Sequence, residues 1–200
     1  MKRPSRRTAG YSLVELLAVL FILGLLFAVG LPALAQISAQ MSLRTACVDL
    51  ASMLNQVRAQ AAFNGKDVGV KWQLTEDDLI YTVYEDGNGN GILSDDIRRG
   101  VDPRVVGPVS LKKRYPGITF SFFPGFKGTD PGGAPIGDLS DPIRFGRSDI
   151  CTFSPIGRAT PGSLYMSNGR DRQAVIRVSP MSAALQVYDW VPGARKWTKR

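Results

Sequence analysis

The sequence predicts an α+β protein in which one long N-terminal helix precedes an antiparallel β-sheet head. Three observations lead to this fold class. Residues Leu16 to Ala35 form a run of 20 residues without a charged or polar side chain, and apolar residues at helical spacing follow it. The rest of the 200-residue chain consists mainly of short runs in which apolar and polar residues alternate. The roughly 165 residues after Ala35 are enough for one modest core.

The first 35 residues have the organisation of a leader followed by a membrane helix. Four of the 25 basic residues lie within the first ten positions, ahead of the apolar run. At ~1.5 Å rise per residue, a helix of that run spans a ~30 Å hydrocarbon core. Positive charges beside a membrane helix stay in the cytoplasm. We therefore expect residues 1–10 to be a basic leader, residues 11–35 to form a single transmembrane helix, and the rest of the chain to lie across the membrane.

Glu15 stands at the start of the apolar run, where a carboxylate is costly and needs a partner. Cleavage between Gly10 and Tyr11 would create an α-amine at Tyr11, four residues before Glu15 and on the same face of a helix. The carboxylate could pair with this amine, or with the same amine of a neighbouring subunit. The second pairing would fix the axial offset between two subunits, which predicts an assembly role for Glu15.

The order Gly10-Tyr11-Ser12-Leu13-Val14-Glu15, before an apolar helix, resembles the processing signal of type IV pilins and pseudopilins. The resemblance implies a pilin-like fold, cleavage between Gly10 and Tyr11 by a prepilin peptidase, and N-methylation of Tyr11. It also implies assembly with other pilins or pseudopilins. Members of that family usually begin with Phe, and Tyr11 departs from this.

An ordinary secretory signal peptide is the alternative for the same segment. Ala33-Leu34-Ala35 is similar to an A-x-A cleavage site, and a basic region precedes the apolar run. However, the run is longer than the usual apolar region of about 7–15 residues, and Glu15 stands at its start. The two alternatives differ in the mature N-terminus, which would be methylated Tyr11 or Gln36.

Residues 36–65 are expected to continue the helix as an amphipathic segment, with Asn64-Gly65 as its stop signal. Its predicted buried stripe has spacings of three and four residues and consists of Leu43, Cys47, Leu50, Leu54, Val57 and Ala61. Residues 66–200 form the β-rich head. Its expected strands are residues 68–74, 79–85, 105–111, 118–123, 150–153, 163–167, 174–179 and 184–191. The Gly- and Pro-rich segment from Pro124 to Pro142 is expected to be a long loop.

Three segments of the C-terminal half resemble the GspH/FimT branch of the pseudopilins. They are Phe153 to Arg158, Pro161 to Tyr165, and Val175 to Ser179. This resemblance implies a minor pseudopilin of a type II secretion system, a subunit of the periplasmic pseudopilus that helps drive protein export. It would be a single-pass protein of the bacterial inner membrane with a periplasmic head. The alternative is a FimT-like minor pilin of a type IV pilus, which could bind DNA during uptake.

Residues 86–97 resemble a calcium-binding loop. Oxygen-bearing side chains stand at the first, third and fifth positions, which are Asp86, Asn88 and Asn90, and Gly91 is sixth. The twelfth position, which should be acidic, is Ile97, with Asp95 and Asp96 placed too early. Alternating Asn and Gly also form turns without an ion. Calcium therefore remains a candidate ligand, and no other cofactor is expected.

Gly169-Arg170-Asp171-Arg172 matches a G-R-x-R pattern associated with DNA-binding FimT-like pilins. In those proteins the pattern follows the strand that corresponds here to Val175 to Ser179, whereas here it precedes that strand. Asn168-Gly169 predicts a hairpin turn at this place. The formal charge of +8 would suit nucleic acid, but the leader and the last six residues carry four positive charges each. A solvated hairpin is the expected structure, with nucleic acid as the alternative partner.

Catalysis and metal chemistry find little support in the composition. The sequence contains no histidine, the commonest general base, and its two cysteines cannot form a zinc site alone. We therefore expect that the protein is not an enzyme. Cys47 and Cys151 could form a disulfide outside the cytoplasm or remain two buried thiols.

Overall fold

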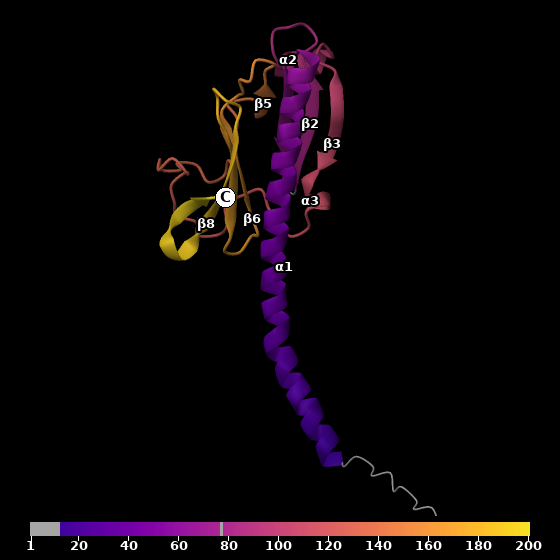
Figure 1. Ribbon diagram of the computed structural model, residues 1–200, viewed down its shortest axis with the longest axis vertical. Helices are drawn as coiled ribbons and strands as arrows, with labels where there is room; N and C mark the ends of the chain where they lie inside the picture. Colours follow the sequence, from indigo (N-terminus) through magenta and orange to yellow (C-terminus); the bar gives the residue numbers. More distant parts are fainter. Residues whose placement is uncertain (1–12, 77) are drawn as a thin grey trace, which may run out of the picture. The chain divides into compact units, whose positions relative to one another are not determined.

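The computed structural model describes residues 13–76 and 78–200, without the side chains of residues 29–40 and 192. The chain divides into two compact units, an N-terminal unit of residues 1–38 and a C-terminal unit of residues 39–200. Helix α1, Leu13–Asn64, is continuous through both (Figure 1). The second half of this helix therefore belongs to the same compact unit as the strands.

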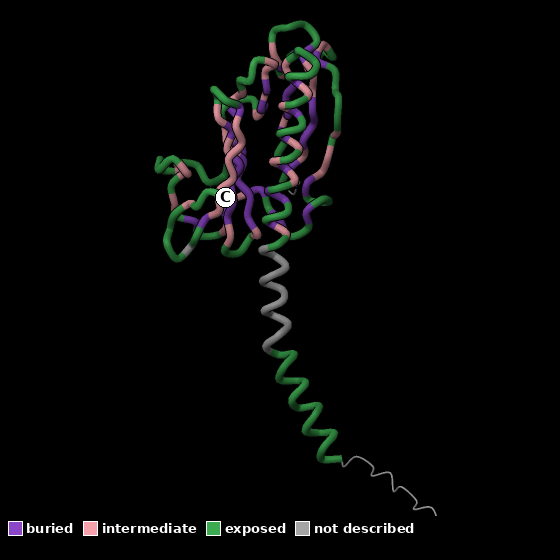
Figure 2. The backbone as a smooth tube through the Cα atoms, viewed as in Figure 1, coloured by how far each residue is buried: buried purple, intermediate pink, exposed green. Residues whose placement is uncertain are grey.

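Helix α1 has two stretches with opposite burial. Every residue from 13 to 28 is exposed (Figure 2). In the second stretch, all six residues of the predicted stripe are buried, with exposed fractions between 0% and 4%. The helix ends at Asn64, where Gly65 takes a left-handed conformation with φ 66° and donates its N–H to the carbonyl of Ala61 at 3.1 Å. The apolar spacing thus marks the face that contacts the strands.

No helix in the part of the chain that the structure describes is long and apolar enough to cross a membrane. The predicted transmembrane helix, residues 11–35, lies partly outside that description, since residues 11 and 12 and the side chains of residues 29–35 are not described.

Two antiparallel sheets form the rest of the C-terminal unit (Figure 1). The first has the strand order β3-β2-β1-β5, with β1 at Val68–Leu74, β2 at Leu79–Glu85, β3 at Arg104–Ser110 and β5 at Ile150–Phe153. The second has the order β4-β6-β7-β8-β9, and its strands are β4 Ile143–Arg144, β6 Gly162–Ser167, β7 Gln173–Val178, β8 Leu185–Val191 and β9 Lys196–Lys199. The architecture is α+β with antiparallel sheets and is compatible with a pilin-like fold.

The expected strand at residues 118–123 is wrong. Apart from a single bridge between Thr119 and Ser167, this segment does not pair with a strand. One edge of β6 is paired with β7, and on the other edge β4 pairs with Ser163 and Leu164, while Thr119 bridges to Ser167 at the far end of the strand. The alternation of this segment instead sends Ile118 and Phe120 into the main core and Phe122 into a second apolar cluster.

The head also contains short helices, which the sequence did not predict. Helix α2, Ser94–Arg99, connects β2 to β3 in the first sheet, and helix α3, Leu111–Arg114, follows β3 on the way to the second sheet. A short 3-10 helix, Pro192–Ala194, joins β8 to β9. Strands β4 and β9 were not predicted, since β4 has only two residues and two of the four residues of β9 are lysines. The segment from Pro124 to Pro142 is a loop, as expected, without a helix or strand.

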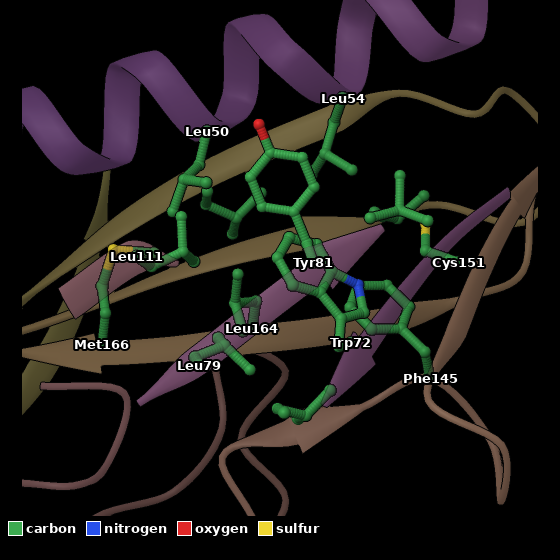
Figure 3. Close-up of a cluster of buried hydrophobic side chains, with 14 of the residues drawn as sticks. Leu50, Leu54, Trp72, Leu79, Tyr81, Leu111, Phe145, Cys151, Leu164 and Met166 are labelled. Atoms are coloured by element: carbon green, nitrogen blue, oxygen red, sulfur yellow. The ribbon is translucent and has the colours of Figure 1, made fainter. Parts of the chain in front are cut away.

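One main core joins α1 to both sheets. In the close-up of Figure 3, Leu50 and Leu54 point from α1 toward Tyr81, Trp72 and Leu164. The ring of Trp72 lies 5.9 Å from that of Tyr81 and 6.4 Å from that of Phe145, between centroids. Burial of this shared apolar surface is what stabilises the C-terminal unit.

The two cysteines lie in this core as separate thiols. Both are free and fully buried, Cys47 on α1 and Cys151 on β5. The sulfur of Cys47 lies 3.3 Å from the sulfur of Met166. Of the two alternatives left open by the sequence, the structure therefore has two buried thiols.

The second apolar cluster packs the long loop from Pro124 to Pro142 against strands of the second sheet. Phe122 and Phe126 pack with Tyr165, Val175 and Trp190. The indole Nε1 of Trp197 in β9 donates to the carbonyl oxygen of Thr129 at 2.6 Å. The loop is thereby tied to β9 as well as to the face of the sheet.

Candidate functional sites

The predicted calcium loop is held together by hydrogen bonds between its own groups. Asp86 accepts from the backbone N–H groups of Asn88 and Gly89 through Oδ1, at 3.0 and 2.8 Å, and from Gly91 through Oδ2, at 2.9 Å. Burial acts to raise the pKa of Asp86, but these backbone donors outweigh it and lower that pKa below its usual value. The Asp86 carboxylate is therefore satisfied by the fold of the loop.

The two other carboxylates of the loop point in different directions. The Oδ2 of buried Asp96 accepts from the amide nitrogens of Asn90 at 2.9 Å and Asn88 at 3.4 Å. Arg99 donates to the other oxygen of Asp96, and the hydrogen bonds from Asn90 and Arg99 lower the pKa of Asp96. Exposed Asp95 instead pairs with Arg98 at 2.6 Å. The structure thus brings Asp96 to the two asparagines and leaves Asp95 outside.

Asp102, which the sequence pattern did not indicate, closes the same loop. This buried residue accepts from the backbone N–H groups of Gly87 and Leu93, both at 3.2 Å. Position 87 must be glycine, because a Cβ there would lie 1.9 Å from the carbonyl oxygen of Val101. Among the described residues, no group of three or more His, Cys, Asp or Glu side chains could hold a metal ion.

The Gly169-Arg170-Asp171-Arg172 segment forms the turn between β6 and β7, as the sequence indicated. Asn168 holds this turn in shape. Its Oδ1 accepts from the backbone N–H groups of Arg170, Asp171 and Arg172, at 3.0, 3.1 and 2.9 Å. Arg170 is exposed. Arg172 is half-buried and its Nε lies 3.7 Å from the Asp171 carboxylate. The two arginines of the motif therefore have different surroundings.

Arg172 lines a cavity of about 260 Å³ together with Arg44 and Arg200. We call this the arginine cavity. Its wall includes Leu43 and Arg44 of α1, and Asp189 and Trp190 of β8. The sequence did not single out Arg44, and it indicated Arg200 only as part of the basic last six residues. Both are far from Arg172 in the chain, and only the fold brings the three together.

The predicted processing site, Gly10 and Tyr11, lies outside the described residues. Glu15 is described, and it lies exposed in the first turn of α1. The large apolar side chains around and after it are also exposed, by 42% to 76% of their surface. They are Leu13, Val14, Leu16, Leu17, Val19, Leu20, Phe21, Ile22, Leu23, Leu25, Leu26 and Phe27. So large an apolar surface marks a segment that contacts a membrane or another protein.

Residues 5–31 match the prokaryotic N-terminal methylation motif. This match covers Gly10, Tyr11, Glu15 and the whole of the exposed stretch of α1, residues 13–28. The chain therefore carries a type IV pilin-like prepilin signal, which indicates a pilin or pseudopilin with a membrane-anchored N-terminus. It also implies processing by a prepilin peptidase and assembly with other pilins.

The prepilin signal ends before the C-terminal unit begins. The segments that resemble the GspH/FimT branch, from Phe153 to Ser179, lie beyond the match. No curated protein and no solved structure matches the chain. The finer assignment therefore depends on the residues of the C-terminal unit alone.

Proposed function

We propose that this chain is a minor pseudopilin of a type II secretion system, anchored in the bacterial inner membrane by residues 11–35. Its leader is cytoplasmic before cleavage, and its C-terminal unit is periplasmic. The subunit takes part in a short pseudopilus that helps drive protein export, and its role is structural rather than catalytic. The prepilin signal, which leads directly into a helix whose apolar side chains are exposed, supports the pilin-like part of this proposal. The resemblance of the segments from Phe153 to Ser179 to the GspH/FimT branch supports the finer part.

The mature N-terminus tests the proposal most directly. Mass spectrometry of the membrane form, purified from cells that contain a prepilin peptidase, is expected to find N-methylated Tyr11 as the first residue. A Gly10→Val chain is the matched control, because a bulky residue there should block cleavage and leave the basic leader attached. A wild-type chain that begins at Met1 or at Gln36 would overturn the proposal.

Glu15 tests the assembly role. A pairing between the Glu15 carboxylate and the amine of a neighbouring Tyr11 requires charge on both groups. We therefore expect Glu15→Ala to leave processing and membrane insertion intact and to prevent co-purification with other pilin-like subunits. Glu15→Asp, which keeps the charge, is expected to retain part of the assembly. Normal assembly of the Glu15→Ala chain would show that the carboxylate has no such role.

A FimT-like minor pilin is the second candidate, and the basic turn at Arg170 and Arg172 is the feature that favours it. The two candidates predict different losses in a deletion strain. A pseudopilin is needed for exoprotein secretion, whereas a FimT-like pilin is needed for DNA uptake. Loss of transformation with normal secretion would select the second candidate.

A further inference from the structure

The arginine cavity gathers positive charge at one point of the C-terminal unit. Three arginines against one aspartate leave the side chains of its wall with a net charge of two. Arg200 is held by Asp189, whose two carboxylate oxygens accept from Nε and Nη2 of Arg200 at 2.5 and 2.6 Å. Burial acts to lower the pKa of Arg200, but the hydrogen bonds that Arg200 donates to Asp189 raise that pKa above its usual value. Asp189 is therefore occupied, and it positions Arg200 at the wall.

The other two arginines keep most of their hydrogen-bonding capacity. Among residues 13–76 and 78–200, the guanidinium of Arg172 forms an ion pair only with the exposed Asp171, at 3.7 Å. The guanidinium of Arg44 forms no hydrogen bond or ion pair with these residues. A guanidinium has five N–H donors in a planar arrangement that matches two oxygens of a phosphate or carboxylate. Two such groups line the arginine cavity with free N–H donors, which an anion could accept from.

The surroundings of the cavity strengthen this preference for an anion. Leu43 is 4% exposed and Trp190 is 5% exposed, so part of the wall is apolar and excludes water. Charges interact more strongly beside such a low-dielectric wall than in open solvent. The volume, about 260 Å³, is slightly below the roughly 300–1,000 Å³ typical of pockets for drug-sized ligands. The cavity thus suits a small anionic group.

The position of Arg44 in the sequence indicates where this group comes from. Only eight residues separate Arg44 from Ala35, the last residue of the apolar run. Nine residues of helix rise about 14 Å, which is roughly twice the ~5–8 Å of headgroup region on one side of a hydrocarbon core. If the apolar run is in the bilayer, as the proposed function requires, Arg44 is tethered just beyond the lipid headgroups, and its long side chain can extend toward them.

We propose that the arginine cavity binds the phosphate of an anionic phospholipid headgroup, through Arg44, Arg172 and Arg200. This inference rests on the proposed membrane anchorage. Duplex DNA fits the geometry less well, because DNA binding needs a row of basic residues along successive phosphates. Here the positive side chains converge on one hollow, and the neighbouring Arg170 does not line it.

The test uses the full chain in a zwitterionic detergent and short-chain lipids that differ only in their headgroup. Phosphatidylglycerol is expected to bind more tightly than phosphatidylcholine of the same chain length. Because a basic side chain near an anionic lipid surface contributes about 1 kcal/mol, Arg44→Gln and Arg172→Gln should each weaken phosphatidylglycerol binding about fivefold. Arg170→Gln is the matched control, since it removes the same charge from the same turn and should leave binding unchanged.

Two further measurements decide the source and the kind of anion. Inorganic phosphate is expected to compete only weakly, because it lacks the membrane attachment of a lipid. Equal binding of both lipids, an Arg170→Gln effect as large as that of Arg172→Gln, or competition by phosphate or duplex DNA at lower concentration than phosphatidylglycerol would each overturn the proposal. Melting temperatures of the three variants should equal that of the wild type, which excludes unfolding as the cause of weaker binding.

The lipid proposal and the proposed function can fail separately. Methylated Tyr11 together with equal binding of both lipids removes only the lipid site. An unprocessed N-terminus together with arginine-dependent phosphatidylglycerol binding removes the pilin-like function and leaves an anionic-lipid site.

Discussion

The two stretches of α1 differ in where their apolar side chains find a partner. Apart from Glu15, residues 13–28 are apolar on every side of the helix, and all of them are exposed. The second stretch is apolar along one stripe and buries that stripe against two sheets. Both stretches belong to one helix, so local helix formation does not distinguish them. The difference is one of solvent: the second stretch completes the core of its own chain, and the first requires a bilayer or other subunits.

The thiol of Cys47 offers the largest expected effect within this comparison. Burial raises the pKa of Cys47 to about 12, against a smaller opposing effect of Arg200, and burial also raises the pKa of Cys151. Since the thiolate is the reactive form, alkylation of the native chain at pH 8 should be at least about a thousandfold slower than in denaturant. Val48→Cys places a thiol on an exposed position next to Cys47 and should react rapidly. Fast labelling of the wild-type chain would contradict the buried stripe.

Truncation of one leucine in each stretch should separate their contributions to stability. Leu54 is fully buried, so Leu54→Ala should lower the free energy of unfolding of the C-terminal unit by about 2–5 kcal/mol. Leu20 is 56% exposed, and Leu20→Ala should change it by less than about 0.5 kcal/mol. Denaturant unfolding of the full chain in detergent, followed by tryptophan fluorescence, measures both. Equal effects would mean that the first stretch also packs on the C-terminal unit.

A charge in the exposed stretch should affect membrane insertion instead. An arginine near the centre of a membrane helix costs about 2.5–3.5 kcal/mol, so Leu20→Arg should lower the inserted fraction relative to the non-inserted one by about a hundredfold. Val48→Arg adds the same charge at an exposed position of the second stretch and should insert normally. Alkaline extraction of membranes followed by immunoblotting measures the two fractions. Normal insertion of Leu20→Arg would place the membrane anchor elsewhere.

Calcium should have the smallest effect. The carboxylates of Asp86 and Asp96 already accept hydrogen bonds from backbone and asparagine donors, so the loop does not need an ion to hold its shape. We expect the melting temperature of the C-terminal unit in the full chain to be the same in millimolar calcium, in magnesium and in a chelator. A rise with calcium alone would identify the loop as a calcium site.

The parts of the fold that follow from local periodicity could be predicted from the sequence. The alternating runs at β1 and β2 and the short run at β5 have the bounds expected, and the helix stops where Asn64-Gly65 indicated. The run at 118–123 alternates as strands do, yet whether it pairs depends on the free edge of β6, which is a property of the whole sheet. Periodicity identifies a buried face but not the neighbour that covers it.

The candidate sites divide in the same way. The prepilin signal is contiguous, and a short pattern was enough to recognise it. The arginine cavity combines Arg44, Arg172 and Arg200, which no local pattern connects. The G-R-x-R motif indicated Arg170 and Arg172 as a pair. Only the fold shows that Arg172 lines the arginine cavity and that Arg170 does not. Asp102 was missed because it acts on the loop from a position beyond it.

The core shared by α1 and both sheets also has a consequence for the order of synthesis. The ribosome makes the stripe from Leu43 to Ala61 long before β6 and β7, which supply Leu164, Met166 and Ile176 to the same core. Contacts between segments so distant in the chain form slowly, and apolar surface that waits uncovered promotes aggregation. During synthesis there is therefore a period in which the apolar stripe of α1 is exposed, because β6 and β7 have not yet been made. Slowing translation after β5 should lengthen this period and increase aggregation.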